Sequence, residues 1–290
     1  MSVAIPVPIV DAALMEAEAI LAAAGVETPR ADAEWLLAGI LGVGRAALAV
    51  NARRPLVAVS AARYDDAVQR RARREPLQRI LGWEEFRGLR FRLTPDVLIP
   101  RPETELFVEL ALGLLPAPGS GQRPRVLDVG TGSGCIACAV AHERHDVAVT
   151  AVDVSAAAAA VARRNVDALG VGVRVVVADL VTATAGASVD LLVANLPYLP
   201  DTLIGALAPE VAEHEPRLAL AGGPDGLDVI RRLIPGARRV LRSGGAVMLE
   251  TSGAAQAHAV AGLLAAAGFV DVVTHDDLAG VTRFAAGRRP

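Results

Sequence analysis

Apolar positions change their spacing along the chain, and the spacing predicts the secondary structure. Beyond Pro100, short apolar runs alternate with segments whose apolar residues recur every three or four positions. The runs predict strands and the segments predict helices of about ten to fifteen residues. We expect strands at Arg125 to Val129, Val147 to Val152, Val173 to Ala178, Val189 to Ala194, Gly245 to Glu250, Phe269 to Thr274 and Val281 to Ala286, and helices at Cys135 to Glu143, Ser155 to Leu169, Leu227 to Leu241 and Ala254 to Ala267.

This alternation favours a mostly parallel sheet of seven strands with helices on both faces, which is an α/β fold. The last two strands have no helix between them. We therefore expect them to pair antiparallel at one edge of the sheet.

The first 75 residues have helical spacing instead. A helix is expected from Asp11 to Ala24, where Gly25 ends it. Thr28 and Pro29 are typical of the cap and first position of a second helix, and a third is expected from Ser60 to Arg74. These elements predict a small helical bundle.

Residues 76–100 have a third pattern. Phe86, Leu89, Phe91 and Leu93 lie on either side of Gly88, and this arrangement predicts a β-hairpin. The chain is therefore expected to consist of a helical domain (1–75), a β-hairpin linker (76–100) and an α/β domain (101–290).

Composition excludes several classes of protein. The chain has 290 residues, of which 53% are hydrophobic, but no uncharged apolar run approaches the ~18 to 20 residues of a membrane span. The first twenty residues lack the basic segment of a secretory signal, so we expect a cytoplasmic protein with no membrane contact. Two cysteines three positions apart supply neither a disulfide framework nor a complete zinc site, and no metal is expected.

Charge is unevenly distributed. The formal net charge is −3, which argues against a generic polyanion binder. Residues 45–92 nevertheless carry twelve arginines against five acidic residues. This zone is interpreted either as a solvated helix face or as a docking surface for an anionic partner, RNA included.

The strongest local signal is the sequence VLDVGTGSGC at residues 126–135. A buried strand is followed by glycines at 130, 132 and 134, which let the backbone approach a ligand and expose helix amides to it. Asp153 ends the next strand, where its carboxylate can accept hydrogen bonds from ribose hydroxyls. Asp128 can take the amino group of a methionine moiety or serve as a turn residue. NAD and S-adenosylmethionine both fit this pattern.

The end of the fourth strand separates the two cofactors. It reads Asn195-Leu196-Pro197-Tyr198, which offers a carboxamide oxygen, a main-chain carbonyl restricted by the following proline and a flat ring. A planar NH2 group can donate one hydrogen to Asn195 and the other to the Leu196 carbonyl while Tyr198 packs on its plane. Such a site favours methyl transfer to nitrogen, in which positioning supplies most of the catalysis.

Several blocks together resemble the HemK/PrmC family of S-adenosylmethionine-dependent methyltransferases. They are REPLQRILGWEEFRGLRF (74–91), VLIPRPETE (97–105), LDVGTGSGCIA (127–137), VDVS (152–155), NLPY (195–198), HEPRLALAGGPDGLDVIRRL (214–233) and GGAVMLE (244–250). The resemblance implies methylation of the side-chain amide nitrogen, N5, of the glutamine in the GGQ motif of peptide chain release factors. It also implies a Rossmann-like seven-stranded methyltransferase sheet, a β-hairpin linker and an N-terminal helical domain that helps to hold the release factor.

The resemblance also implies roles for individual residues. The cofactor loop corresponds to Gly130, Thr131, Gly132, Ser133 and Gly134, the ribose-binding acid to Asp153, and the adenine side to Asp179 and Leu180. The substrate-amide motif corresponds to Asn195, Leu196, Pro197 and Tyr198, and the RPET block, with Arg101 and Glu103, is expected close to the active site.

Two segments depart from the family pattern. Leu196 replaces a proline of the usual N-P-P-Y motif, and the segment ETSGAAQ (250–256) replaces a more polar one. The form N-L-P-Y is familiar in rRNA adenine dimethyltransferases, so a nucleic-acid adenine N6-methyltransferase using the same four residues is the alternative. A regulatory protein that has lost catalysis and an NAD oxidoreductase are further, weaker alternatives.

Overall fold

The computed structural model describes residues 8–118 and 123–290. Their contacts separate into two compact units. Unit 1 extends to Gly82 and also includes Ala208–His214, whereas unit 2 comprises Trp83–Leu207 and Glu215–Pro290. Chain segments that are distant in sequence therefore belong to one unit.

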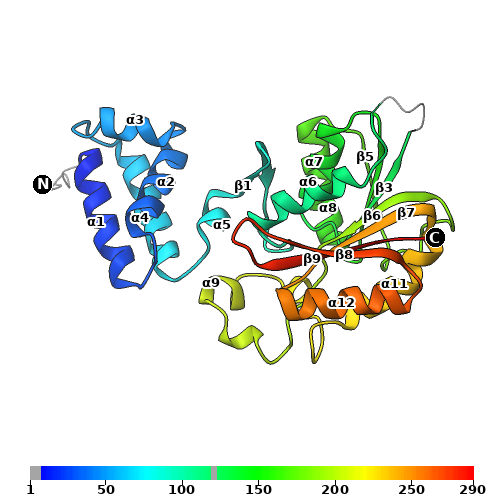
Figure 1. Ribbon diagram of the computed structural model, residues 1–290. Helices are drawn as coiled ribbons and strands as arrows, with labels where there is room; N and C mark the ends of the chain where they lie inside the picture. Colours follow the sequence, from blue (N-terminus) through cyan, green and yellow to red (C-terminus); the bar gives the residue numbers. More distant parts are fainter. Residues whose placement is uncertain (1–7, 119–122) are drawn as a thin grey trace, which may run out of the picture. The chain divides into compact units, whose positions relative to one another are not determined.

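Unit 1 is a helical bundle (Figure 1). Its helices are α1 (Val10–Ala23), α2 (Pro29–Leu41), α3 (Arg45–Val50), α4 (Ala58–Ala72), α5 (Leu77–Leu81) and α9 (Pro209–Ala212). Leu21, Leu37 and Tyr64 lie in its core, and the Tyr64 hydroxyl donates to the Ala33 carbonyl at 3.0 Å. The three predicted helices are confirmed, whereas α3, α5 and α9, each six residues or shorter, were not predicted.

The expected side-chain cap at Thr28 is wrong. Thr28 does precede helix α2 and Pro29 is its first residue, but the Thr28 side chain accepts no cap hydrogen bond. Its hydroxyl instead donates to the Asp32 carboxylate at 2.9 Å. Asp32 is 5% exposed and also accepts from Arg71 Nε at 2.7 Å. A buried carboxylate needs hydrogen-bond donors. The Thr28 hydroxyl therefore bonds to Asp32 instead of capping the helix.

The predicted hairpin is confirmed in unit 2. Strands β1 (Trp83–Phe86) and β2 (Leu89–Arg92) pair antiparallel with Phe86 opposite Leu89. Phe86 and Phe91 are buried and pack edge to face, with ring centroids 6.2 Å apart. The apolar residues thus anchor the hairpin to the core of unit 2.

The large sheet has seven strands in the order β5-β4-β3-β6-β7-β9-β8. Strands β3 to β7 run parallel, while β9 pairs antiparallel with both β7 and β8. The α/β fold and the antiparallel edge are therefore confirmed. The strands are β3 (Arg125–Val129), β4 (Ala148–Asp153), β5 (Val173–Val177), β6 (Val189–Ala194), β7 (Leu241–Glu250), β8 (Val270–Asp276) and β9 (Thr282–Arg288).

Most boundaries shift by one or two residues from their predictions, and the largest shift is at the start of β7. Strand β7 begins at Leu241 rather than at Gly245. Leu241 was expected to be helical, but it pairs with Val189 of β6, and a register shift follows between Val189 and Leu191. Pairing with a neighbouring strand overrides the local helical pattern there.

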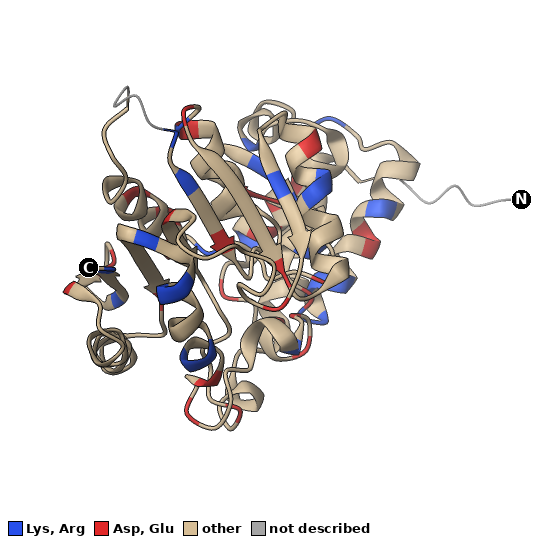
Figure 2. Cartoon of the chain, turned by 90° about the vertical axis from the view of Figure 1, so that its right-hand side faces the viewer, with Lys and Arg blue, Asp and Glu red and all other residues tan. Residues whose placement is uncertain are grey.

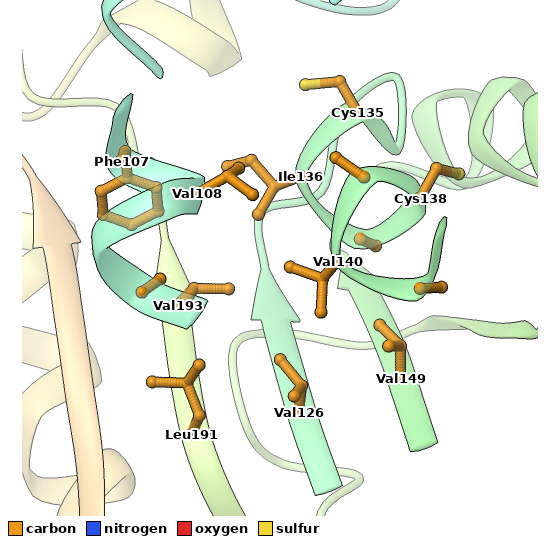
Figure 3. Packing of buried hydrophobic residues seen from close by; sticks show 14 of the residues in the cluster. Phe107, Val108, Val126, Cys135, Ile136, Cys138, Val140, Val149, Leu191 and Val193 are labelled. Atoms are coloured by element: carbon orange, nitrogen blue, oxygen red, sulfur yellow. The ribbon is translucent and has the colours of Figure 1, made fainter. Parts of the chain in front are cut away.

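Helices cover both faces of the sheet. Buried residues of α6 (Glu103–Gly113), α7 (Cys135–Glu143) and α8 (Ala156–Leu169) pack on one face. Those of α11 (Asp228–Val240) and α12 (Ala254–Ala266) pack on the other. Figure 3 shows Phe107, Val108, Ile136 and Val140 of the first group above Val126, Val149, Leu191 and Val193 of the strands. This packing fixes the strand ends that carry the site.

Two short helical segments of unit 2 follow β6 in the chain. They are η1 (Ile204–Ala206) and α10 (Arg217–Leu220). Helix α6 was not predicted, although Pro102 before it and Glu103 and Glu105 in its first turn are typical of a helix start. In the described ranges no helix is long and apolar enough to span a membrane.

Candidate active site

A cavity of about 430 Å³ lies at the carboxyl ends of β4, β3 and β6. These strands are neighbours in the sheet, and ligands of open α/β sheets bind at such a point, where the strand order reverses. Figure 2 shows acidic positions, drawn red, at the tips of strand arrows. The predicted site residues that line the cavity are Arg101, Gly130, Thr131, Gly132, Ser133, Asp153, Asp179, Leu180, Asn195, Leu196 and Pro197. Glu103, Asp128, Gly134 and Tyr198 do not line it.

The glycine turn has the conformation that its sequence predicts. Gly130, Gly132 and Gly134 have φ angles of +76°, +55° and +85°, which side chains rarely adopt. The amides of Gly130 and Thr131 both donate to the Val152 carbonyl, at 2.8 and 3.0 Å. The turn is thereby tied to the end of β4.

The glycine turn also packs against the N-L-P-Y segment. A Cβ atom at Gly130 would lie 2.9 Å from Leu196 Cδ2. Leu196 is 4% exposed, so its side chain fills the space that the glycine leaves. The leucine that departs from the family pattern is thus a packing contact between two parts of the site.

Asp153 ends β4 and is held by main-chain donors. Its Oδ2 accepts from the Gly132 amide at 2.9 Å and its Oδ1 from the Ser155 amide at 2.8 Å. Burial raises the pKa of this carboxyl, and the amide hydrogen bonds oppose that effect. Each carboxylate oxygen keeps a lone pair with which it can accept a hydrogen bond from a ligand hydroxyl.

Asp128 is completely buried below the turn. Its Oδ2 accepts from the Thr131 hydroxyl at 2.6 Å, whereas its Oδ1 has no partner among the described residues. Burial raises its pKa to about 7. An unpaired buried acceptor is costly, and a cationic ligand group would satisfy it.

Asp179 and Leu180 form the side of the cavity that follows β5. Asp179 pairs with Arg232 at 2.5 Å, and both side chains are substantially exposed. Leu180 has a φ of +49°. The structure thus brings these predicted residues to the lining of the cavity. The Asp179 carboxylate already forms an ion pair with Arg232 there.

Asn195 has a fixed side chain. Its Nδ2 donates to Glu250 Oε1 at 2.9 Å and lies 3.4 Å from the Thr104 hydroxyl oxygen. Thr104 donates to the same Glu250 oxygen at 3.2 Å. Burial of Glu250 raises its pKa to about 7. Both hydrogen bonds of the Asn195 side chain use its nitrogen. Its carboxamide oxygen is therefore left to accept a hydrogen bond from a ligand.

Tyr198 is held through its main chain. Gln256 Nε2 donates to the Tyr198 carbonyl at 2.9 Å, while Gln256 Oε1 accepts from the Ser252 amide at 2.9 Å. Burial raises the pKa of the Tyr198 hydroxyl to about 12, so it stays protonated. The segment 250–256 therefore contacts both ends of the N-L-P-Y motif.

Sequence reasoning did not select Thr104, Glu250 and Gln256 as site residues. A signal for Glu250 was present, because it directly follows the apolar run of β7, the strand that pairs with β6 just before Asn195. Thr104 directly follows Glu103 as the last residue of the RPET block, of which only Arg101 and Glu103 were selected. Gln256 carried no such signal, because it lies in a helix, α12.

Arg101 and Glu103 diverge in position. Arg101 lines the cavity and its Nη2 donates to both oxygens of Glu215, at 2.8 and 2.9 Å. The Glu215 side chain is 1% exposed, so the pair fixes the chain that follows unit 1's segment 208–214. Glu103 begins helix α6 outside the cavity lining.

Many arginines of residues 45–92 are already paired with acidic groups. Arg70 pairs with Glu75, Arg71 with Asp32, and Arg90 with Glu85. Arg45, Arg74 and Arg87 pair with Glu34, Glu210 and Glu143. These ion pairs neutralise part of the positive charge that the composition of residues 45–92 predicts for the surface.

The two cysteines and the acidic residues form no metal site. Cys135 and Cys138 are free and buried, and burial raises both thiol pKa values, that of Cys135 to about 12. Across residues 8–118 and 123–290, no group of three His, Cys, Asp or Glu side chains is placed to hold a metal ion.

Two family models match the chain. The PrmC N-terminal domain matches residues 12–82, and the methyltransferase small domain matches residues 108–209. The first lies in unit 1 and the second covers the strands that carry the cavity.

Full-length relatives decide the family. Proteins named release factor glutamine methyltransferase from Geobacter sulfurreducens and Cereibacter sphaeroides are each 44% identical to this chain. The first alignment covers 92% of both proteins, and the second covers 96% of this chain and 98% of the relative. The chain belongs to the release factor glutamine methyltransferase family. A relative of the same name from Bradyrhizobium diazoefficiens is 41% identical, over 97% of this chain and 95% of its own.

Solved structures support the fold. The T. thermophilus 16S rRNA N2 G1207 methyltransferase, in complex with AdoMet and guanosine, superimposes with a TM-score of 0.52 at 21% identity, over 72% of this chain and 50% of that one. The human methyltransferase 10 domain containing protein gives 0.53 at 17% identity, over 78% and 98%. At these identities the likeness shows a methyltransferase fold.

Substitution of Gly130 by alanine tests the contact with Leu196. Gly130→Ala and Gly170→Ala both place a side chain at positive φ, but nothing lies within 4 Å of a Cβ at Gly170. Both variants should lose roughly 1 to 2 kcal/mol of unfolding free energy through the positive φ, and Gly130→Ala should lose more because it also overpacks against Leu196. Only Gly130→Ala should also weaken S-adenosylmethionine binding, by roughly tenfold, because overpacking displaces the turn. Calorimetric titration measures this affinity, and equal affinities in the two variants would contradict the assignment.

Proposed function

We propose that this protein transfers a methyl group from S-adenosylmethionine to the side-chain amide nitrogen, N5, of the glutamine in the GGQ motif of peptide chain release factors. The observation that carries the proposal is the fixed carboxamide of Asn195, whose nitrogen is bound to Glu250 and whose oxygen remains an acceptor. Family membership and the names of the relatives support the same substrate.

The cavity fits this cofactor. Its volume of about 430 Å³ is within the range of small-molecule sites, about 300 to 1,000 Å³. Asp153 would accept from the ribose hydroxyls, and residues 130–134 would face the methionine part. The unpartnered Oδ1 of Asp128 suits the ammonium group, and Asp179 and Leu180 would border the adenine. The cofactor supplies an electrophilic methyl group on a sulfonium.

The N-L-P-Y residues would position the substrate. Asn195 Oδ1 would accept one hydrogen of the glutamine amide and the Leu196 carbonyl the other. Pro197 restricts the preceding carbonyl, and the ring of Tyr198 would pack on the amide plane. Holding both hydrogens aims the nitrogen at the methyl group, and orientation of this kind contributes several kcal/mol to catalysis. Arg101 would help to shape the entrance through its pair with Glu215.

The helical domain would recognise the protein substrate. We propose that residues 1–75 supply this recognition, that residues 76–100 form the linker, and that residues 101–290 carry the methyltransferase chemistry. Exposed arginines of residues 45–92 would meet an acidic surface of the release factor, with RNA contact as a secondary role. Because the proposed substrate acts in translation termination, the proposed activity would be cytoplasmic.

Transfer of labelled methyl to purified release factor tests the function directly. We expect label on the wild-type factor and none on a factor in which the GGQ glutamine is changed to alanine. Unmodified rRNA serves as the parallel acceptor. Label on rRNA instead would make the N-L-P-Y segment an adenine site and contradict the proposal.

The division of roles within the cavity predicts two different defects. Asn195→Ala should reduce kcat about 100-fold, because an unoriented amide is a poor nucleophile, and should leave cofactor affinity within about threefold. Asp153→Ala should weaken the cofactor first, because it removes a charge-assisted hydrogen-bond acceptor worth roughly 1.5 to 3 kcal/mol. Steady-state kinetics and calorimetric titration separate the two effects. An equal loss of cofactor affinity in both variants would contradict the assigned roles.

Cofactor affinity should depend on pH through Asp128. Burial raises the pKa of its carboxyl to about 7, so the group is largely protonated below that pH and ionised above it. Pairing with an ammonium needs the ionised form. Affinity should therefore rise roughly five- to tenfold from about pH 6 to about pH 7.5, above which loss of the ammonium proton opposes the rise.

Two variants check this pH dependence. Asp128→Asn should flatten the rise, whereas Asp167→Asn, at an exposed acid of helix α8, should keep it. Titration calorimetry at several pH values makes the comparison. An unchanged slope in Asp128→Asn would remove Asp128 from the cofactor site.

A further inference from the structure

Glu250 is a buried acid at the end of β7 whose carboxyl forms no direct ion pair among the described residues, although the charge of Arg283 acts on it. It is 2% exposed, and in the described part of the chain its hydrogen bonds come from Asn195 and Thr104. Its second oxygen, Oε2, has no hydrogen-bond partner there. An unpaired carboxylate in such a place costs several kcal/mol of folding free energy. An apolar residue at the end of the strand would cost less folding free energy. We therefore expect Glu250 to act on the residues that it contacts.

The neighbour that depends on Glu250 is the carboxamide of Asn195. An asparagine side chain can rotate by half a turn and exchange its oxygen with its nitrogen at almost no steric cost. In one orientation it presents an acceptor to the cavity, and in the other it presents two donors. A substrate NH2 group needs the acceptor, and the flipped carboxamide would repel it.

We propose that Glu250, assisted by Thr104, is the positioning residue that selects the acceptor orientation of Asn195. A carboxylate oxygen only accepts hydrogen bonds, so Glu250 Oε1 holds the NH2 end of Asn195 at 2.9 Å. The amide oxygen must then point the other way. Thr104 donates to the same Oε1 at 3.2 Å, which fixes the carboxylate in turn.

The selection does not require Glu250 to be charged. Its unpartnered Oε2 is the oxygen that would carry a proton, because Oε1 is occupied by two donors. Oε1 remains an acceptor in both states. Glu250 Oε1 is engaged by Asn195 and Thr104, so we assign Glu250 a role that acts through Asn195. This inference rests on the proposed function, since it assigns the group that orients the substrate-binding amide.

Three variants of the full-length enzyme test the proposal. Glu250→Met removes the acceptor at similar size and should lower kcat about 100-fold with cofactor affinity within about threefold. Glu250→Gln keeps a carbonyl oxygen towards Asn195 and should restore kcat to within a few-fold of the wild type. Thr104→Val should lower kcat about fivefold, because the hydrogen bonds that join Thr104 to Glu250 and to Asn195 are lost. Kinetics on release factor and calorimetric titration of the cofactor give the readouts.

Asp190→Asn is the matched control. Asp190 is a buried acid at the opposite end of β6, where it accepts from the Arg125 amide. This variant should keep the wild-type kcat. A wild-type kcat in Glu250→Met, an equal loss in Glu250→Gln, or a loss in Asp190→Asn equal to that in Glu250→Met would each overturn the proposal.

A second measurement separates this proposal from the proposed function. The side-chain NH2 signals of Asn195, identified by their absence in Asn195→Ala, are followed by hydrogen exchange in nuclear magnetic resonance spectra. We expect slow exchange in the wild type and in Glu250→Gln, and faster exchange in Glu250→Met. Equal exchange in all three would overturn the positioning role whatever the substrate. A wild-type enzyme that fails to methylate release factor, but shows this exchange pattern, would refute the substrate assignment alone.

Discussion

Parallel pairing of β3 with β4 on one side and β6 on the other is the constraint on which the site depends. It brings the ends of three strands, Val129, Asp153 and Ala194, to the same edge of the sheet. The glycine turn follows Val129, Asp153 is the last residue of its strand, and the N-L-P-Y segment follows Ala194. Two apolar layers, one on each face, hold the strands in place, and the burial of that much apolar surface is the main source of their stability. A one-residue slip of any strand would move its terminal group away from the cavity.

Two buried carboxyl groups near the strand ends further shape the site, because no solvent reaches them. Asp128 and Glu250 are both buried, and burial raises the pKa of each to about 7. Each has one oxygen with protein donors and one without a hydrogen-bond partner in the described ranges. Such groups reduce stability, and both lie beside residues that would handle ligand. Leu196 adds an apolar link, because it fills the space above Gly130 and joins the glycine turn to the N-L-P-Y segment.

Unit 1 depends on ion pairs that tie distant parts of the chain together. Its segment 208–214 lies in sequence between Tyr198 and Glu215, but its contacts belong to the helical unit. Glu210 accepts from Arg71 at 2.9 Å and from Arg74 at 2.6 and 2.8 Å. Arg71 also donates to buried Asp32, so one arginine joins α4, α2 and α9. Arg71 and Arg74 of the arginine-rich stretch therefore serve as structural links within unit 1.

The sequence by itself determined the strands, most of the helices, the antiparallel edge, the glycine turn and the N-L-P-Y segment. These features depend on residues close together in the chain, whose periodicity and turn chemistry are local properties. Only the tertiary structure decided which groups hold them. The side chain of Asn195 bonds to Glu250, 55 positions away in the sequence, and to Thr104, 91 positions away. The Tyr198 carbonyl accepts from Gln256, 58 positions away. Likewise, the Thr28 hydroxyl does not cap helix α2 but donates to the Asp32 carboxylate. The same carboxylate accepts from Arg71, which lies 39 positions further along the chain. An acid or an arginine has the same local pattern whether it is solvated or paired, because its partner is chosen by packing between elements rather than by its neighbours in the chain.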